Sequence, residues 1–137
     1  MYRRLAITAA VAVLLGASGC TANGSSSSSA TFTGTKGDVA KVVSDLSQAG
    51  RRKQADRICT QILARTLVQQ LSQAGTSCAQ EMKKAIEDAS DFDLEVLKVT
   101  ITGATATAEV KRGKNGPTEA MTFARENGQW RATSLSG

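Results

Sequence analysis

The sequence predicts an α+β domain in which N-terminal helices pack on an antiparallel four-stranded sheet, and three observations lead to this prediction. Between residues 37 and 89, apolar residues recur every three or four positions, as on one face of a helix. From Asp91 onward apolar and polar residues alternate, which is typical of strands with one buried face. Turn signals divide this second part into four strands, and the strongest is Asn127-Gly128, a type I′ hairpin pair. Helices and strands in separate blocks indicate an α+β fold.

The first helix is expected to begin near Gly37. Asp38 can cap its N-terminus, and Gly50 stands where a glycine commonly ends a helix. Between these positions the apolar residues follow helical spacing and would face the core. They are Val39, Val42, Val43 and Leu46.

A second helical region is expected from residues 51–53 to Gly75. Its length is unusual for one helix in a small domain, so a break near Cys59-Thr60 is expected. Its apolar stripe consists of Ile58, Ile62, Leu63, Leu67 and Leu71.

A third helix is expected to begin after Ser77. Ser77 is followed three residues later by Gln80, which is the pattern of a capping box. Its inward-facing residues would be Met82, Ala85, Ile86 and Ala89. Cys59 and Cys78 would then join the second helical region to the start of the third helix.

The alternating half predicts four strands, the last over residues 130–135, with turns at residues 103–104, 113–117 and 127–128. The phase of the alternation reverses near Val96, which predicts a β-bulge there. The small alanines of the second strand leave room either for a closely packed helix or for a pocket. The expected inward-facing residues of the first three strands are Leu97, Val99, Ile101, Ala106, Ala108, Val110, Met121 and Phe123.

The N-terminus has the organisation of a secretory signal. A basic start, a short apolar run over residues 5–17 and small residues stand directly before Cys20. The run is shorter than the roughly 20 residues of a membrane-spanning helix. The arrangement resembles a bacterial lipobox, in which the cysteine receives a diacylglyceryl group. We therefore expect a signal peptide over 1–19, a lipidated Cys20 with a flexible serine-rich linker over 20–36, and one domain over 37–137, held at the extracytoplasmic face of the cell membrane.

The cysteine and histidine content restricts the chemistry of the chain. With Cys20 lipidated, Cys59 and Cys78 remain, and an exported domain favours a disulfide between them. The alternative is two buried free thiols. The chain has no histidine, and so lacks the commonest general base and the commonest metal ligand. No catalytic residue, cofactor or metal site is therefore predicted.

Charge offers one candidate contact surface. The net charge of +5 falls to +3 when the signal peptide is removed, which is weak support for a nucleic-acid partner, and none is expected. Arg51, Arg52 and Lys53 form the densest basic patch and could contact anionic lipid heads or an acidic envelope polymer. The ordinary interpretation is a solvated helix start. The acidic residues between Asp88 and Glu95 are interpreted as a solvated turn.

Four short phrases accompany the predicted order of elements. They are Ile58-Cys59, Gly75-Thr76-Ser77-Cys78, Leu94-Glu95-Val96 and Arg125-Glu126-Asn127-Gly128-Gln129-Trp130-Arg131. Together with the lipobox and the serine linker, they resemble small bacterial lipoproteins of the nuclear-transport-factor-2-like (cystatin-like α+β) superfamily. The resemblance implies a curved sheet wrapped by helices into a cone that often holds a pocket, and it makes a homodimer possible.

The enzyme members of that superfamily hold an acid or a tyrosine in the pocket. The only tyrosine here is Tyr2, in the signal peptide, and alternation places Glu109 on the solvent face. The prediction is therefore a non-catalytic domain that binds an envelope protein or a small apolar ligand. The alternatives are an isomerase- or cyclase-like enzyme of the same superfamily and an electrostatic envelope adaptor.

Overall fold

The computed structural model describes residues 31–89 and 91–135. Five helical segments come first: α1 (Gly34–Arg51), α2 (Ala55–Arg57), the π-helix η2 (Ile58–Ile62), α3 (Arg65–Gln73) and α4 (Cys78–Asp88). Four strands follow: β1 (Leu94–Thr102), β2 (Thr105–Arg112), β3 (Thr118–Glu126) and β4 (Gln129–Ser134). They form one antiparallel sheet in the order β1-β2-β3-β4, so the predicted α+β class is confirmed. The predicted signal peptide and Cys20 lie outside the described residues.

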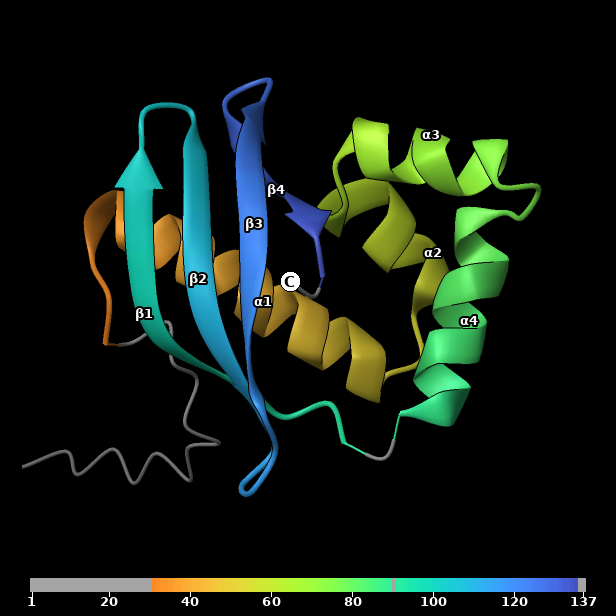
Figure 1. Ribbon diagram of the computed structural model, residues 1–137, viewed down its shortest axis with the longest axis horizontal. Coiled ribbons are helices and arrows are strands. Elements are labelled where there is room, and N and C mark those ends of the chain that lie inside the picture. The colour runs from red at the N-terminus through yellow and green to blue at the C-terminus, as the bar shows by residue number, and fades with distance from the viewer. Residues whose placement is uncertain (1–30, 90, 136–137) are drawn as a thin grey trace, which may run out of the picture.

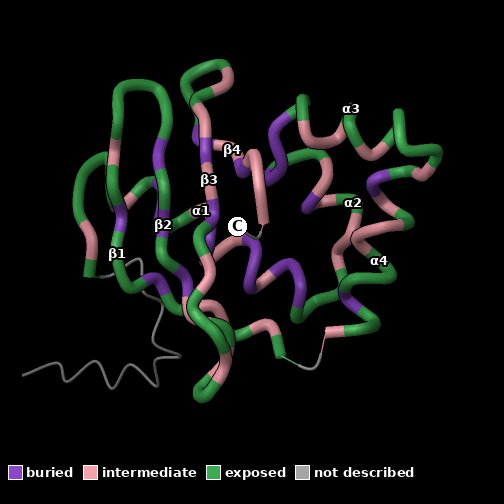
Figure 2. Tube along the Cα trace, in the orientation of Figure 1, coloured by how far each residue is buried: buried purple, intermediate pink, exposed green. Residues whose placement is uncertain are grey.

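The sheet has one covered face. Helix α1 crosses behind the strands, while α2, α3 and α4 gather beside β4 (Figure 1). The buried positions lie in α1, in the middle of β2 and β3 and in the neighbouring parts of the other elements (Figure 2). On the opposite face, alternate residues such as Thr100, Thr107, Glu109 and Ala120 are exposed, and no described helix covers them.

Helix α1 begins earlier than predicted, at Gly34, three residues inside the expected linker. Thr33 is its N-cap, and Asp38 lies within the helix, so the prediction that Asp38 caps it was wrong. The backbone before α1 packs closely on its first turn. Gly37 N–H donates to the Thr33 carbonyl, and a Cβ at Gly37 would lie 2.8 Å from the Phe32 carbonyl oxygen.

The end of α1 also differs from the prediction, because Gly50 is a buried helical residue. The left-handed position falls instead on Lys53, with φ of 56°. Lys53 N–H donates to Gly50 O at 3.0 Å, and Gln54 N–H to Ala49 O at 2.9 Å, the two bonds of a Schellman ending. Gly50, three residues earlier, leaves space for the ring of Phe92.

The second helical region breaks at Leu63 and Ala64, whose backbones are extended, and not at Cys59-Thr60 as expected. Leu63 forms a parallel bridge with Ala132 of β4, and Ala64 N–H donates to Ala132 O at 2.8 Å. The break therefore satisfies part of the outer edge of β4. Ala64 offers no side-chain cap to α3. The Glu126 carboxylate, at the end of β3, accepts from Arg65 N–H at 2.8 and 3.2 Å and takes that role.

The predicted bulge in β1 is confirmed between Val96 and Lys98. Leu97 is the extra residue, and 46% of it is exposed, so the prediction that Leu97 faces inward was wrong. The extra residue restores the phase, and Val99 is buried like Val96. At the other end of the sheet, Asn127 and Gly128 have φ of 50° and 77°, both positive as a type I′ turn requires.

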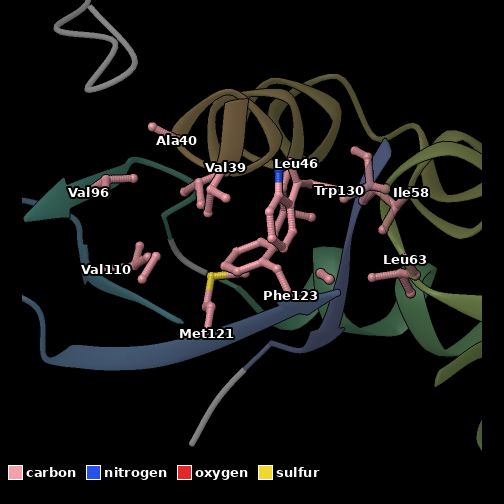
Figure 3. Packing of buried hydrophobic residues seen from close by; sticks show 14 of the residues in the cluster. Val39, Ala40, Leu46, Ile58, Leu63, Val96, Val110, Met121, Phe123 and Trp130 are labelled. Atoms are coloured by element: carbon pink, nitrogen blue, oxygen red, sulfur yellow. The ribbon is translucent and has the colours of Figure 1, made fainter. Parts of the chain in front are cut away.

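The main core lies between α1 and the sheet. Ala106 and Ala108 are buried in the same cluster as Val39 and Val43, so the small residues of β2 accommodate a helix. Figure 3 shows the indole of Trp130 beneath α1, next to Leu46, with the Phe123 ring and Met121 on its sheet side. The prediction that Phe123 faces inward is confirmed, and Trp130 is buried beside it.

The disulfide between Cys59 and Cys78 is present, with 6.0 Å between the two Cα atoms. It joins η2 to the first residue of α4. The predicted capping box is also confirmed: Ser77 Oγ accepts from Gln80 N–H at 3.2 Å, and Ser77 N–H donates to the Gln80 side chain at 3.5 Å. Covalent and capping interactions thus fix the same end of α4.

Replacing Cys59 tests the bridge. Because the cross-link restricts the unfolded chain, Cys59→Ser should lower the free energy of unfolding by about 3 kcal/mol. Urea unfolding measures the loss, and alkylation should then modify Cys78. The matched control is Cys20→Ser, which should leave the unfolding midpoint of the domain unchanged. Two alkylatable thiols at positions 59 and 78 of the unmodified chain would contradict the bridge.

Candidate functional site

A pocket of about 170 Å³ lies where α4 and the second half of α1 meet one end of the sheet. Its position is set by α4, by the α4–β1 connector (Ala89 and residues 91–93 as described) and by the ends of the first three strands. The walls are mostly apolar, as is usual in small-molecule sites. They include Leu46, Met82, Ile86, Phe92, Val110 and Met121.

Three charged residues line the same pocket: Asp91, Arg112 and Glu119. Arg112 Nη2 lies 3.2 Å from Glu119 Oε2, and the two side chains are 44% and 32% exposed. Glu119 pairs with Val110 across β2 and β3, which puts it on the inner face of the sheet in phase with Met121. These residues make a charged mouth above an apolar interior.

The connector is attached to α1 through Phe92. A Cβ at Gly50 would overlap the Phe92 ring atoms Cδ1, Cε1 and Cγ, so the ring occupies the space that the glycine leaves. Ser47 Oγ donates a hydrogen bond to the Phe92 carbonyl. This contact explains why Gly50 lies inside the helix, and it holds Phe92 in the pocket wall.

Asp93 and Asp91 extend this attachment to the sheet. Arg51 Nη1 lies 2.6 Å from Asp93 Oδ1, and Gly113 N–H donates to Asp93 O at 2.7 Å. Asp91 Oδ1 accepts from Asp93 N–H at 2.8 Å. The connector is thus held between the end of α1 and the β2–β3 loop, which restricts the position of the pocket mouth.

The basic patch predicted from the sequence lies at the end of α1, apart from the pocket. Its three residues, Arg51, Arg52 and Lys53, are exposed. Arg51 is engaged with Asp93, whereas Arg52 and Lys53 form no salt bridge with any residue that the structure describes. The acidic residues before the sheet also differ in their surroundings: Asp91 lines the pocket, whereas Asp93 pairs with Arg51. Within residues 31–89 and 91–135, no group of three or more cysteine or acidic side chains could hold a metal ion.

A second, wider hollow of about 600 Å³ lies beside η2 and α3. Its lining is largely polar, and several of those groups already hold the fold together. Glu126 caps α3, and Arg131 donates to Thr60 O at 3.1 Å and to the Gln129 side chain at 3.2 Å. The smaller apolar pocket is therefore the better candidate for a ligand.

The aromatic residues divide between core and pocket. Phe92 lines the pocket, whereas Trp130 is not part of its wall. The Trp130 ring is buried against α1 with Arg125 stacked over it, 5.1 Å from the guanidinium carbon to the ring centroid. Its Nε1 is buried without a hydrogen-bond partner in the described structure.

Sequence reasoning missed the charged mouth. The signal for Glu119 was present, because it follows the same alternation as Met121 and Phe123. For Asp91 and Arg112 no such signal existed: Asp91 lies in a connector, and Arg112 ends a strand.

No family model, no curated protein and no solved structure matches this chain. None of the helices in the described part of the chain has the length and apolar character needed to cross a bilayer.

Gly50→Ala tests the attachment of Phe92. In an unhindered helix the change stabilises by about 1 kcal/mol, because alanine is the better helix former. Here the new methyl group meets the Phe92 ring, so we expect a net loss of about 1–3 kcal/mol in urea unfolding. In a Phe92→Ala background the same substitution should become stabilising. A stabilising effect with Phe92 present would show that the ring does not pack on Gly50.

Proposed function

We propose that this chain is a lipid-anchored, extracytoplasmic binding protein whose apolar pocket holds a small apolar ligand without turnover. The observation that carries the proposal is the pocket between α4 and the sheet. Its volume of about 170 Å³ is close to that of an engineered cavity of about 150 Å³ that takes up benzene. The ligand would therefore have an apolar part the size of one ring or a short chain.

The order of the elements supports membership of the nuclear-transport-factor-2-like superfamily as part of this proposal. Helices precede a four-stranded antiparallel meander, and the pocket lies between helices and sheet. Fold likeness does not assign activity, so the binding function rests on the pocket and not on the family.

An enzyme of the isomerase or cyclase type is the weaker alternative. Such an enzyme needs a carboxylate that is sheltered from water and free to accept a proton. Glu119 is the closest candidate, but its side chain is about one-third exposed and is paired with Arg112. An electrostatic adaptor is also weaker, because Arg51 of the basic patch is already paired with Asp93.

The anchor completes the proposal. Lipid on Cys20 would tether a domain whose first helix begins at Gly34. A flexible segment of this length has a root-mean-square reach of about 20 Å. The domain would then stay near the bilayer while its pocket remains open to the surrounding solution.

Ligand binding can be followed at two methionines. The chain has three methionines, and Met82 and Met121 both line the pocket. With isotope-labelled methyl groups, titration with hexanol should shift the NMR signals of these two and saturate. Ala89→Phe, at a half-buried position on the pocket wall, should weaken binding at least about tenfold because the new ring occupies the apolar space.

The matched control is Ala120→Phe, the same substitution at an exposed position on the opposite face of the sheet. It should leave hexanol binding unchanged. The absence of saturable shifts in the unmodified protein, or equal weakening by both variants, would contradict a binding role for this pocket.

The anchor prediction concerns Cys20. Cys20→Ser removes the thiol that would receive the lipid, so the protein should move from the membrane to the soluble fraction. Fractionation and immunoblotting measure the shift, with Cys59→Ser as the control that keeps Cys20. Membrane association that persists in Cys20→Ser would rule out the lipid anchor.

A further inference from the structure

The charges at the pocket mouth carry a more specific inference, which rests on the proposed binding function. We propose that the pocket selects amphiphiles with a short apolar body and a basic head group over the corresponding carboxylic acids. The apolar walls would hold the body of the ligand, and the mouth would discriminate between head groups.

The mouth has an excess of negative charge. Asp91, Arg112 and Glu119 are the titratable side chains that line the pocket among the residues described. Two carboxylates and one guanidinium leave one negative charge where a head group would leave the apolar interior. Asp91 and Arg112 are exposed and Glu119 is half-buried, so this charge acts through a partly solvated mouth and its effect is modest.

Arg112 is poorly available to an anionic head group. Its Nη2 already contacts Glu119 Oε2 at 3.2 Å. A ligand carboxylate would have to displace Glu119 or lie beside it and Asp91. Both arrangements bring like charges together, which disfavours binding.

Asp91 is available to a cationic head group. Neither lysine nor arginine pairs with it in the described structure, where its Oδ1 accepts a hydrogen bond from Asp93 N–H. The hydrogen bond to Oδ1 restrains the carboxylate, and its Oδ2 lies against Gly113, where a Cβ would be only 2.6 Å away. A fixed carboxylate with unused acceptor sites suits an ammonium or amidinium group.

The test compares hexylamine, hexanol and hexanoate, which differ chiefly in the charge of the head group at neutral pH. Binding is measured at the Met82 and Met121 methyl signals at low ionic strength. We expect hexylamine to bind about fivefold more tightly than hexanoate, with hexanol between them, because exposed charges such as Asp91 contribute only modestly. The preference should shrink as salt is added.

Two outcomes separate the inference from the proposed function. If the ligands bind but hexanoate equals or exceeds hexylamine, the charge selectivity is wrong and the binding function stands. If none of the three binds, both are wrong.

Charge-neutral variants locate the selectivity. Asp91→Asn should reduce the affinity for hexylamine to that for hexanol. Glu119→Gln should release Arg112 and raise the affinity for hexanoate toward that for hexylamine. Glu109→Gln is the matched control, because Glu109 is exposed on the opposite face of the sheet. Thermal unfolding checks that each variant is folded. An unchanged ratio of hexylamine to hexanoate affinity in folded Asp91→Asn and Glu119→Gln would overturn the assignment.

Discussion

The packing of Phe92 on Gly50 is the contact on which the arrangement of helices and sheet depends. The chain passes once from its helical half to its sheet, and Phe92 lies in that passage. Ser47 and Arg51 hold the residues around it from the same part of α1. Because these three interactions hold Phe92 and Asp93 against α1, they fix the distance between α1 and the start of the first strand. That distance creates the pocket, so the fold and the candidate site have a common physical cause.

The helical segments beyond α1 are restrained at two further points. The disulfide joins η2 to α4, and Leu63 with Ala64 lies against β4. The second contact also limits the open edge of the sheet, where unpaired backbone groups would otherwise invite association. The opposite edge strand, β1, carries the bulge at Leu97 instead. The two edge strands of this small sheet therefore differ: a bridge covers part of β4, and a bulge distorts β1. The bridge at β4 also brings the start of α3 close to Glu126, which caps it.

The sequence predicted what short-range periodicity determines and missed what long-range packing determines. The four strands, the bulge near Val96 and the capping box at Ser77 could be inferred from spacing and residue type, and the disulfide from the number of cysteines and the expected export. Gly50 was misplaced because a glycine near a helix end usually terminates it, and only the fold reveals that Phe92 needs the space. The same limit applies to the site. Met82 and Ile86 were predicted to face inward, but the sequence does not tell whether they meet the sheet or leave a hollow.

The hollow itself favours a ligand. An enclosed void of about 170 Å³ would cost a core about 4 kcal/mol, a large share of the stability of a small domain, although an open mouth lets water reduce that cost. A larger side chain at Ala85 or Ala89 would narrow the hollow, yet both wall positions carry alanine. A ligand that fills the space regains the missing contacts while the connector already holds Phe92 in place. Since little ordering is then needed, affinity should depend on the fit of the apolar body and on the charge at the mouth.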